Sequence, residues 1–195
     1  MSVRVRQLVL FAAAAVAVIV AAYGIGKVAA SYSNDDAKRL YVSARAYATD
    51  ELVARMNTIV VGGQIPDHTF HLLNGDTIQL SHLLSTRTLL IFLDPTCPTC
   101  LGQAEMVVRV AQTGDERRHF LFVTKADETQ VRQLQSQLGI NCRILRDANG
   151  VFHDALNVHS SPFSVLVDTN RVIERIVLGK LLEEEITQMA SSGKL

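Results

Sequence analysis

Leu-Leu-Ile-Phe-Leu-Asp-Pro-Thr-Cys-Pro-Thr-Cys, residues 89–100, is the stretch that decides the fold. Its first five residues are apolar, with β-branched and aromatic members, and they predict a buried strand that ends at Asp94-Pro95. Behind it, apolar residues recur at the three- and four-residue spacing of an amphipathic helix that runs to about Gln112. The stretch therefore predicts a strand, a tight turn and a helix, with Cys97 at the start of the helix.

Two cysteines at this place indicate thiol–disulfide chemistry. The free N–H groups and the positive end of a helix favour an anion, so we expect Cys97 to ionise more easily than an ordinary thiol. The thiolate is the form that attacks a disulfide, and Cys100, one turn along, is placed to displace whatever Cys97 has captured. Metal binding by the pair is the alternative, but zinc needs two more ligands and no second Cys or His pair of suitable spacing follows.

Three motifs in order resemble the thioredoxin-fold redoxins of the TlpA/ResA type. Residues 62–70 with the hairpin at 73–80 are similar to the first part of that domain, Cys-Pro-Thr-Cys to its active-site motif, and residues 158–168 to its cis-proline loop and next strand. The resemblance covers about residues 63–189 and implies an α/β fold, a mixed sheet flanked by helices. The sequence from Asp94 to Cys100 also resembles that of MauD-like redoxins, which are membrane-anchored and assist maturation of methylamine dehydrogenase.

The resemblance implies a role for each residue of the candidate site. Cys97 is the expected nucleophile and Cys100 the resolving thiol. Pro162 is expected in the cis form, facing the cysteine pair, which an X-Pro bond permits at small cost. The backbone of Ser161 would then pair with bound substrate; an ordinary trans proline opening a strand is the alternative.

Two residues between the cysteines complete the predicted substrate-binding set. Pro98 lacks an N–H and so removes one backbone donor near the thiolates. The Thr99 hydroxyl is either a further donor there or merely packs. We expect no metal and no cofactor.

The proton route departs from the family pattern. Ile91 stands where many relatives carry a polar or acidic residue, and Gln103 stands where they often carry glutamate. Asp94 and Glu105 are the candidate substitutes, and we count Asp94 among the predicted catalytic residues. The alternatives are that Asp94 only forms the turn before the proline and that Glu105 is a solvated helix residue.

Composition excludes several function classes. The 195 residues carry 19 basic and 19 acidic side chains without a basic cluster, so no nucleic-acid partner is expected. Three cysteines with a single close pair argue against a disulfide-stapled scaffold. Neither cysteine of the pair follows a Thr or Ser by three residues, as a peroxidatic cysteine would, and the spacing is one residue short of a copper-delivery motif. Cys142, His153 and His159 are each expected to be packing or surface residues.

The amino end predicts a membrane anchor. No charge occurs from Leu8 to Ile25, a helix length that nearly crosses the ~30 Å hydrocarbon layer. We therefore predict a cytoplasmic N-terminus (1–6), a transmembrane anchor (7–26), a juxtamembrane helix and linker (27–60) and a thioredoxin-like domain (61–195). A signal peptide cleaved after Ala30 is the alternative, and both interpretations export the domain.

The sequence thus predicts a single-pass protein of the inner membrane with its redoxin domain in the periplasm. Its expected activity is thiol–disulfide exchange with protein thiols and disulfides, as a reductase by family analogy, coupled to an upstream membrane electron donor or acceptor. Two alternatives stay open: a MauD-like maturation factor for one client, and a redox-inactive binding module.

Overall fold

The computed structural model describes residues 34–45, 59–112, 120–138 and 143–191 of the chain. It divides into two compact units, residues 1–44 and 45–195. In the smaller unit the described residues are helical. The predicted anchor at 7–26 and Cys142 lie outside the described residues. Within the described ranges, no helix is both long and apolar enough to cross a membrane.

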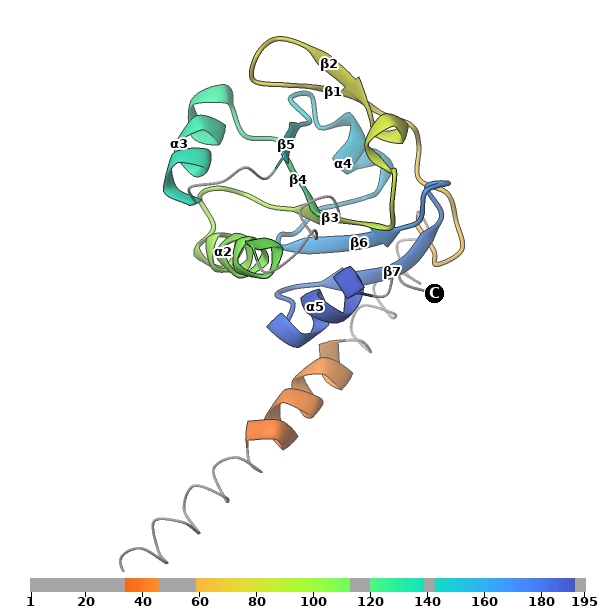
Figure 1. Ribbon diagram of the computed structural model, residues 1–195, viewed down its shortest axis with the longest axis vertical. Helices are drawn as coiled ribbons and strands as arrows, with labels where there is room; N and C mark the ends of the chain where they lie inside the picture. The colour runs from red at the N-terminus through yellow and green to blue at the C-terminus, as the bar shows by residue number, and fades with distance from the viewer. Residues whose placement is uncertain (1–33, 46–58, 113–119, 139–142, 192–195) are drawn as a thin grey trace, which may run out of the picture. The chain divides into compact units, whose positions relative to one another are not determined.

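The larger unit is built on one mixed sheet of seven strands, in the order β2-β1-β5-β4-β3-β6-β7 (Figure 1). The strands are β1 (Thr69–His71), β2 (Thr77–Gln79), β3 (Thr88–Phe92), β4 (Phe120–Thr124), β5 (Arg143–Arg146), β6 (Phe163–Val167) and β7 (Ile173–Leu178). The three central strands β3, β4 and β5 run parallel, and the remaining strands join antiparallel at both edges. This confirms the predicted mixed sheet.

Helices cover both faces of this sheet, which explains why its central strands are continuous apolar runs. Every residue of β3, β4 and β6 is buried. The helical elements are η1 (Leu80–Leu83), α2 (Pro98–Gln112), α3 (Glu128–Leu138), α4 (Val151–Ala155) and α5 (Glu183–Ser191). Helices α2 and α5 pack against each other beneath one face (Figure 1). Strand β3 and helix α2 agree with the strand and helix that the sequence predicts within residues 89–112.

The two faces of β3 carry different surroundings, and this matters for the site. Ile91 belongs to the apolar core under α2 and α5, and Cys97 and Cys100 pack into that same core. Phe92, the next residue, points to the opposite core, where it stacks at 5.8 Å on Phe152 of α4. The period of two along the strand therefore separates the cysteine pair from α4.

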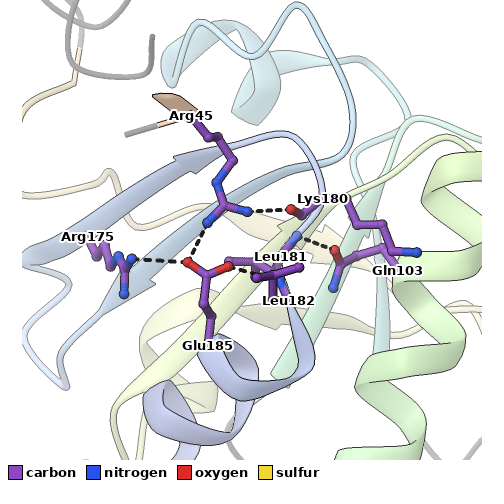
Figure 2. Close-up of polar contacts among 7 residues, drawn as sticks. All are labelled: Arg45, Gln103, Arg175, Lys180, Leu181, Leu182 and Glu185. Atoms are coloured by element: carbon purple, nitrogen blue, oxygen red, sulfur yellow. Dashed lines mark hydrogen bonds and ion pairs between the residues drawn. The ribbon is translucent and has the colours of Figure 1, made fainter. Parts of the chain in front are cut away.

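Arg45, the first residue of the larger unit, forms polar contacts with residues at the start of α5 (Figure 2). Its guanidinium donates to the carbonyl of Lys180 and to the carboxylate of Glu185. Glu185 also accepts from Arg175 at 3.3 Å and from the Leu182 N–H at 2.9 Å. The last contact is the glutamate half of a capping box, so one carboxylate both caps α5 and binds two arginines.

Candidate active site

The turn after β3 is built by Asp94. One carboxylate oxygen accepts hydrogen bonds from the backbone N–H and the hydroxyl of Thr96, both at 2.8 Å. The Asp94 carbonyl accepts the N–H of Cys97 at 3.0 Å. These contacts are those of an Asx turn, the alternative that the sequence left open for this residue. A proton-transfer role for Asp94 stays a prediction.

Cys97 occupies the N-cap position of α2. Its carbonyl accepts the first helical hydrogen bond, from Leu101 N–H at 3.1 Å, and Pro98 follows at the first helical position, where its missing N–H costs nothing. The Cys97 sulfur then lies 3.4 Å from the N–H of Cys100, in the place that a serine or aspartate oxygen takes in an ordinary N-cap. The half-buried sulfur is thus held where helix N–H groups converge.

The contacts of this N-cap hold the pKa of Cys97 below its usual value of 9.0. The largest cause is the hydrogen bond from the Cys100 thiol, and the backbone N–H groups of Cys100 and Thr99 act in the same direction. Partial burial and the charge of Asp94 oppose them. Donors directed at the sulfur favour its anion, so the attacking form of Cys97 is the stabilised one.

Cys100 has the opposite character. It is 0% exposed, and burial is the largest cause that raises its pKa above 9.0. The hydrogen bond that it gives to Cys97 raises the pKa further, while hydrogen bonds from the Ser161 side chain and the Asp94 backbone lower it. The site therefore pairs a half-buried, easily ionised thiol at position 97 with a shielded thiol that keeps its proton at position 100.

The Ser161–Pro162 loop lies at this site, and its peptide bond is cis, as the resemblance implies. The hydrogen bond between Ser161 and Cys100 places the loop against the buried sulfur. Strand pairing fixes the loop, because Phe163, directly after the proline, is opposite Phe92 in the β3–β6 ladder. Substrate pairing by the Ser161 backbone, and roles for the exposed Pro98 and Thr99 in binding, stay predictions.

The surroundings behind the cysteines lack an acid among the described residues. Ile91 is fully buried, and Gln103, also 0% exposed, uses its carbonyl oxygen to accept the N–H of Leu181 at 2.6 Å (Figure 2). The amide nitrogen of Gln103 and the hydroxyl of Ser164 have no hydrogen-bond partner in the described structure. Glu105 is exposed on α2, which agrees with the solvated alternative. Thus Gln103 has a structural contact where relatives carry glutamate.

A cleft of about 390 Å³ opens beside the site, within the range of small-molecule and peptide subsites. Three loops form its wall: the turn after β3, the loop after β4 and the segment before Pro162. The lining residues are Phe92, Leu93, Asp94, Pro95, Thr96, Thr124, Lys125, Ala126, Gln130, His153, Val158, His159, Ser160 and Ser161.

Sequence reasoning missed one feature of this cleft, a buried Asp147–His153 pair. The carboxylate of Asp147 accepts both the His153 N–H, at 2.8 Å, and the His153 ring Nδ1, at 2.7 Å. Burial alone would raise the pKa of Asp147, but the hydrogen bonds from His153 and the Phe152 N–H hold it below 3.8. His153 is buried, as a packing residue would be, yet it also lines the cleft. The signal was an acidic residue before a Gly150 turn that opens a helix.

Metal ligation finds no support in the described ranges, where no three His, Cys, Asp or Glu side chains converge.

The redoxin family model matches residues 60–190. Among solved structures, a secreted Mycobacterium tuberculosis disulfide oxidoreductase homologous to Escherichia coli DsbE is 22% identical and covers 65% of this chain and 96% of its own, with a TM-score of 0.56. The thioredoxin domain of a Bacteroides vulgatus thiol–disulfide oxidoreductase is 14% identical, with coverages of 69% and 97% and a TM-score of 0.59.

The Mycobacterium tuberculosis peroxidoxin BcpB is 16% identical, with coverages of 69% and 98% and a TM-score of 0.60. Among curated proteins, none matches this sequence. The structural likenesses show the thioredoxin-like fold, which oxidoreductases and peroxidoxins share, so the chemistry must be argued from the cysteines.

Proposed function

Because the chain belongs to the redoxin family and carries the cysteine pair of a thiol–disulfide oxidoreductase, we propose that it exchanges disulfides with protein partners in the periplasm, as a reductase. The observation that carries the exchange chemistry is the opposite perturbation of the two thiols, and the direction of reduction follows from family analogy. Cys97 is half-buried with a lowered pKa, and Cys100 is buried with a raised one. The Thr or Ser that a peroxidatic cysteine has three residues before it is replaced here by Asp94.

The exchange proceeds in two displacements. The Cys97 thiolate attacks one sulfur of the client disulfide, so a Cys97–client bond forms and the client's other sulfur leaves as a thiolate that takes up a proton. Cys100 then loses its proton and attacks the Cys97 sulfur. The Cys97–Cys100 disulfide forms, the second client sulfur leaves and is protonated, and the client has gained two electrons and two protons.

Cysteine variants test this proposal. Wild type should reduce a peptide disulfide stoichiometrically, Cys97→Ser should not, and Cys100→Ser should stop at the mixed disulfide, which is visible by non-reducing mass spectrometry. Equal rates in wild type and Cys97→Ser would contradict the proposal. His82→Asn, an exposed substitution on η1, is the matched control.

The direction of electron flow has its own measurement. A reductase should have a potential near that of thioredoxin, about −270 mV, whereas an oxidase would lie near −120 mV. The lowered pKa of Cys97 stabilises the dithiol form and shifts the potential toward the oxidising side. A potential close to −120 mV would therefore assign oxidation rather than reduction.

We also propose that residues 7–26 anchor the chain in the inner membrane. The support is the uncharged segment from Leu8 to Ile25 with Arg4 and Arg6 before it. The full-length chain should stay in the membrane fraction after alkaline washing, and a membrane-impermeant maleimide should label Cys97 in cells with a permeable outer membrane. Release by the wash would favour cleavage after Ala30, and protection of Cys97 would contradict the periplasmic location.

A second candidate, a maturation factor for one client, draws support from the surroundings of the pair. Ile91 is apolar and Gln103 is held by Leu181, so a general proton acceptor behind the cysteines is missing among the described residues. Slow exchange with arbitrary substrates fits a client-specific protein. Cys100→Ser should then trap one dominant mixed disulfide in membranes, while many trapped partners would favour the general reductase.

A further inference from the structure

His153 lies on the α4 side of β3, opposite the core into which the cysteines pack. The His153 ring packs edge-to-face against Phe92, with ring centroids 5.0 Å apart. Thr96 and Ser161 line the same cleft as His153. These two residues are next to Cys97 and Pro162 in sequence. A client whose sulfur is bonded to Cys97 and whose chain meets the Ser161 loop therefore enters this cleft.

The histidine ring is fixed in one orientation. Nδ1 is 2.7 Å from one oxygen of the Asp147 carboxylate, and the same oxygen accepts the backbone N–H of His153 at 2.8 Å. The Nε2 atom of His68 lies 3.6 Å from the other oxygen. The other ring nitrogen of His153, Nε2, has no hydrogen-bond partner among the described residues. The His153 side chain is 6% exposed, so its small accessible part belongs to the cleft wall. A carboxylate that accepts a hydrogen bond from Nδ1 in this way fixes the orientation and the tautomer of the ring.

Disulfide exchange with a protein creates a need for such a group. The client sulfur that leaves is an alkyl thiolate, and it departs more easily when a proton reaches it. Behind the cysteine pair the described side chains are the apolar Ile91 and the amide of Gln103, while Glu105 of α2 is exposed. His153 is a titratable side chain on the client's side of the site.

Resting on the proposed disulfide exchange, we propose that His153 is a further catalytic residue that gives its Nε2 proton to the leaving client sulfur, with Asp147 as its positioning residue. As the Cys97–client bond forms and the client S–S bond breaks, the proton passes from imidazolium to the departing sulfur, which leaves as a thiol. Neutral His153 regains a proton from water. In the oxidising direction the same nitrogen accepts the proton of the client thiol that attacks.

Several charged or titratable groups surround His153, and a pH profile must take account of them. They are Asp147 and His68 beside the ring, and Asp94, Lys125 and His159 in the cleft wall.

A comparison of leaving groups tests the proposal in the full-length protein. Reduced wild type and His153→Asn are each mixed with a peptide disulfide, which releases an alkyl thiolate, and with 5,5′-dithiobis(2-nitrobenzoic acid), which releases an aromatic thiolate that leaves without a proton. Asparagine keeps a donor near the position of Nδ1 and removes Nε2. We expect the peptide rate to fall about tenfold or more and the aromatic rate to stay within about twofold, because general acid catalysis acts only on the poor leaving group.

Two further variants sharpen the result. Asp147→Asn should lower the rate with the peptide disulfide and leave the rate with the aromatic disulfide unchanged. A merely structural role of Asp147 would change both rates together. His82→Asn should change neither rate. Equal peptide rates in wild type and His153→Asn, or a parallel fall with both disulfides, would overturn the role of His153. If wild type itself exchanged with neither disulfide, the proposed function would fail first, and this inference with it.

A measurement on wild type alone keeps the proposal falsifiable if His153→Asn does not fold. Proton transfer in the displacement predicts a normal solvent deuterium isotope effect with the peptide disulfide and none with the aromatic one. The absence of an isotope effect with the peptide disulfide would overturn the proposal.

Discussion

Replacing Arg45 by methionine should destabilise the redoxin domain through α5. The Arg45 side chain is 8% exposed, and its guanidinium donates to the Lys180 carbonyl and to Glu185, whose side chain is 10% exposed (Figure 2). Methionine keeps most of the apolar stem and removes both charge-assisted hydrogen bonds. The substitution therefore isolates the polar contacts of the residue.

The size of the effect follows from what remains around Glu185. Breaking a buried ion pair costs about 3–5 kcal/mol when the remaining charge is left uncompensated. Here Arg175 still contacts the carboxylate at 3.3 Å, and the Leu182 N–H still donates to it. We therefore expect a loss of about 2–3 kcal/mol in the free energy of unfolding, the range of one or two hydrogen bonds to a charged group.

Urea unfolding of the full-length chain in detergent, followed by far-ultraviolet circular dichroism, measures this loss. The matched control is Arg39→Met, an exposed position in the helix before Arg45, for which a change within about 0.5 kcal/mol is expected. If Arg45→Met were as stable as Arg39→Met, the polar cluster in Figure 2 would contribute nothing to stability and the reasoning would be refuted.

Three further predictions concern the cysteine pair and its surroundings. The pH midpoint for alkylation of Cys97 should lie below 9.0 and move upward in Cys100→Ala, because the largest cause of the lowered pKa is removed; an unchanged midpoint would contradict that cause. Gln103→Glu keeps an acceptor for the Leu181 N–H but buries an ionisable group. Urea denaturation should therefore show a loss of about 2 kcal/mol in the free energy of unfolding at pH 8. The loss should be smaller at pH 5, because burial favours the neutral carboxyl. Because the pKa of Asp147 is lowered, its contribution to stability is present above its unfolded value near 3.8 and is lost as pH falls through the folded value. The stability advantage of wild type over Asp147→Asn should therefore shrink in acid titrations below about pH 4, and a constant difference would argue against the hydrogen-bonded carboxylate.

Local patterns predicted the fold because its decisive features are local. The period of β3, the Asp94-Pro95 turn and the apolar spacing of α2 are each contained within a few residues, and together they place Cys97 at a helix start. The same holds for the hairpin around Gly75, whose positive φ is the one that its turn requires.

Contacts between distant segments could not be predicted in this way. The Leu181 N–H that donates to Gln103 is 78 residues away in the sequence. From the sequence, Gln103 could be described only as a position where relatives often carry glutamate. Likewise, three loops separated in sequence form the cleft, so nothing near His153 indicated that its ring would line it. The Asp147–His153 contact is short in sequence, but it depends on the left-handed Gly150 that directs the chain into α4.

The arrangement of β3 links these observations to the chemistry. Because neighbouring residues of a strand point to opposite faces, Ile91 gives the cysteine pair an apolar background while Phe92 gives His153 its packing surface. An apolar background keeps Cys100 protonated and buried, which suits a thiol that must wait for the mixed disulfide. It also means that a proton for the client is not supplied from behind the sulfurs by any described carboxyl group. Under the proposed role of His153, the cleft that it lines is the side from which the leaving sulfur is protonated.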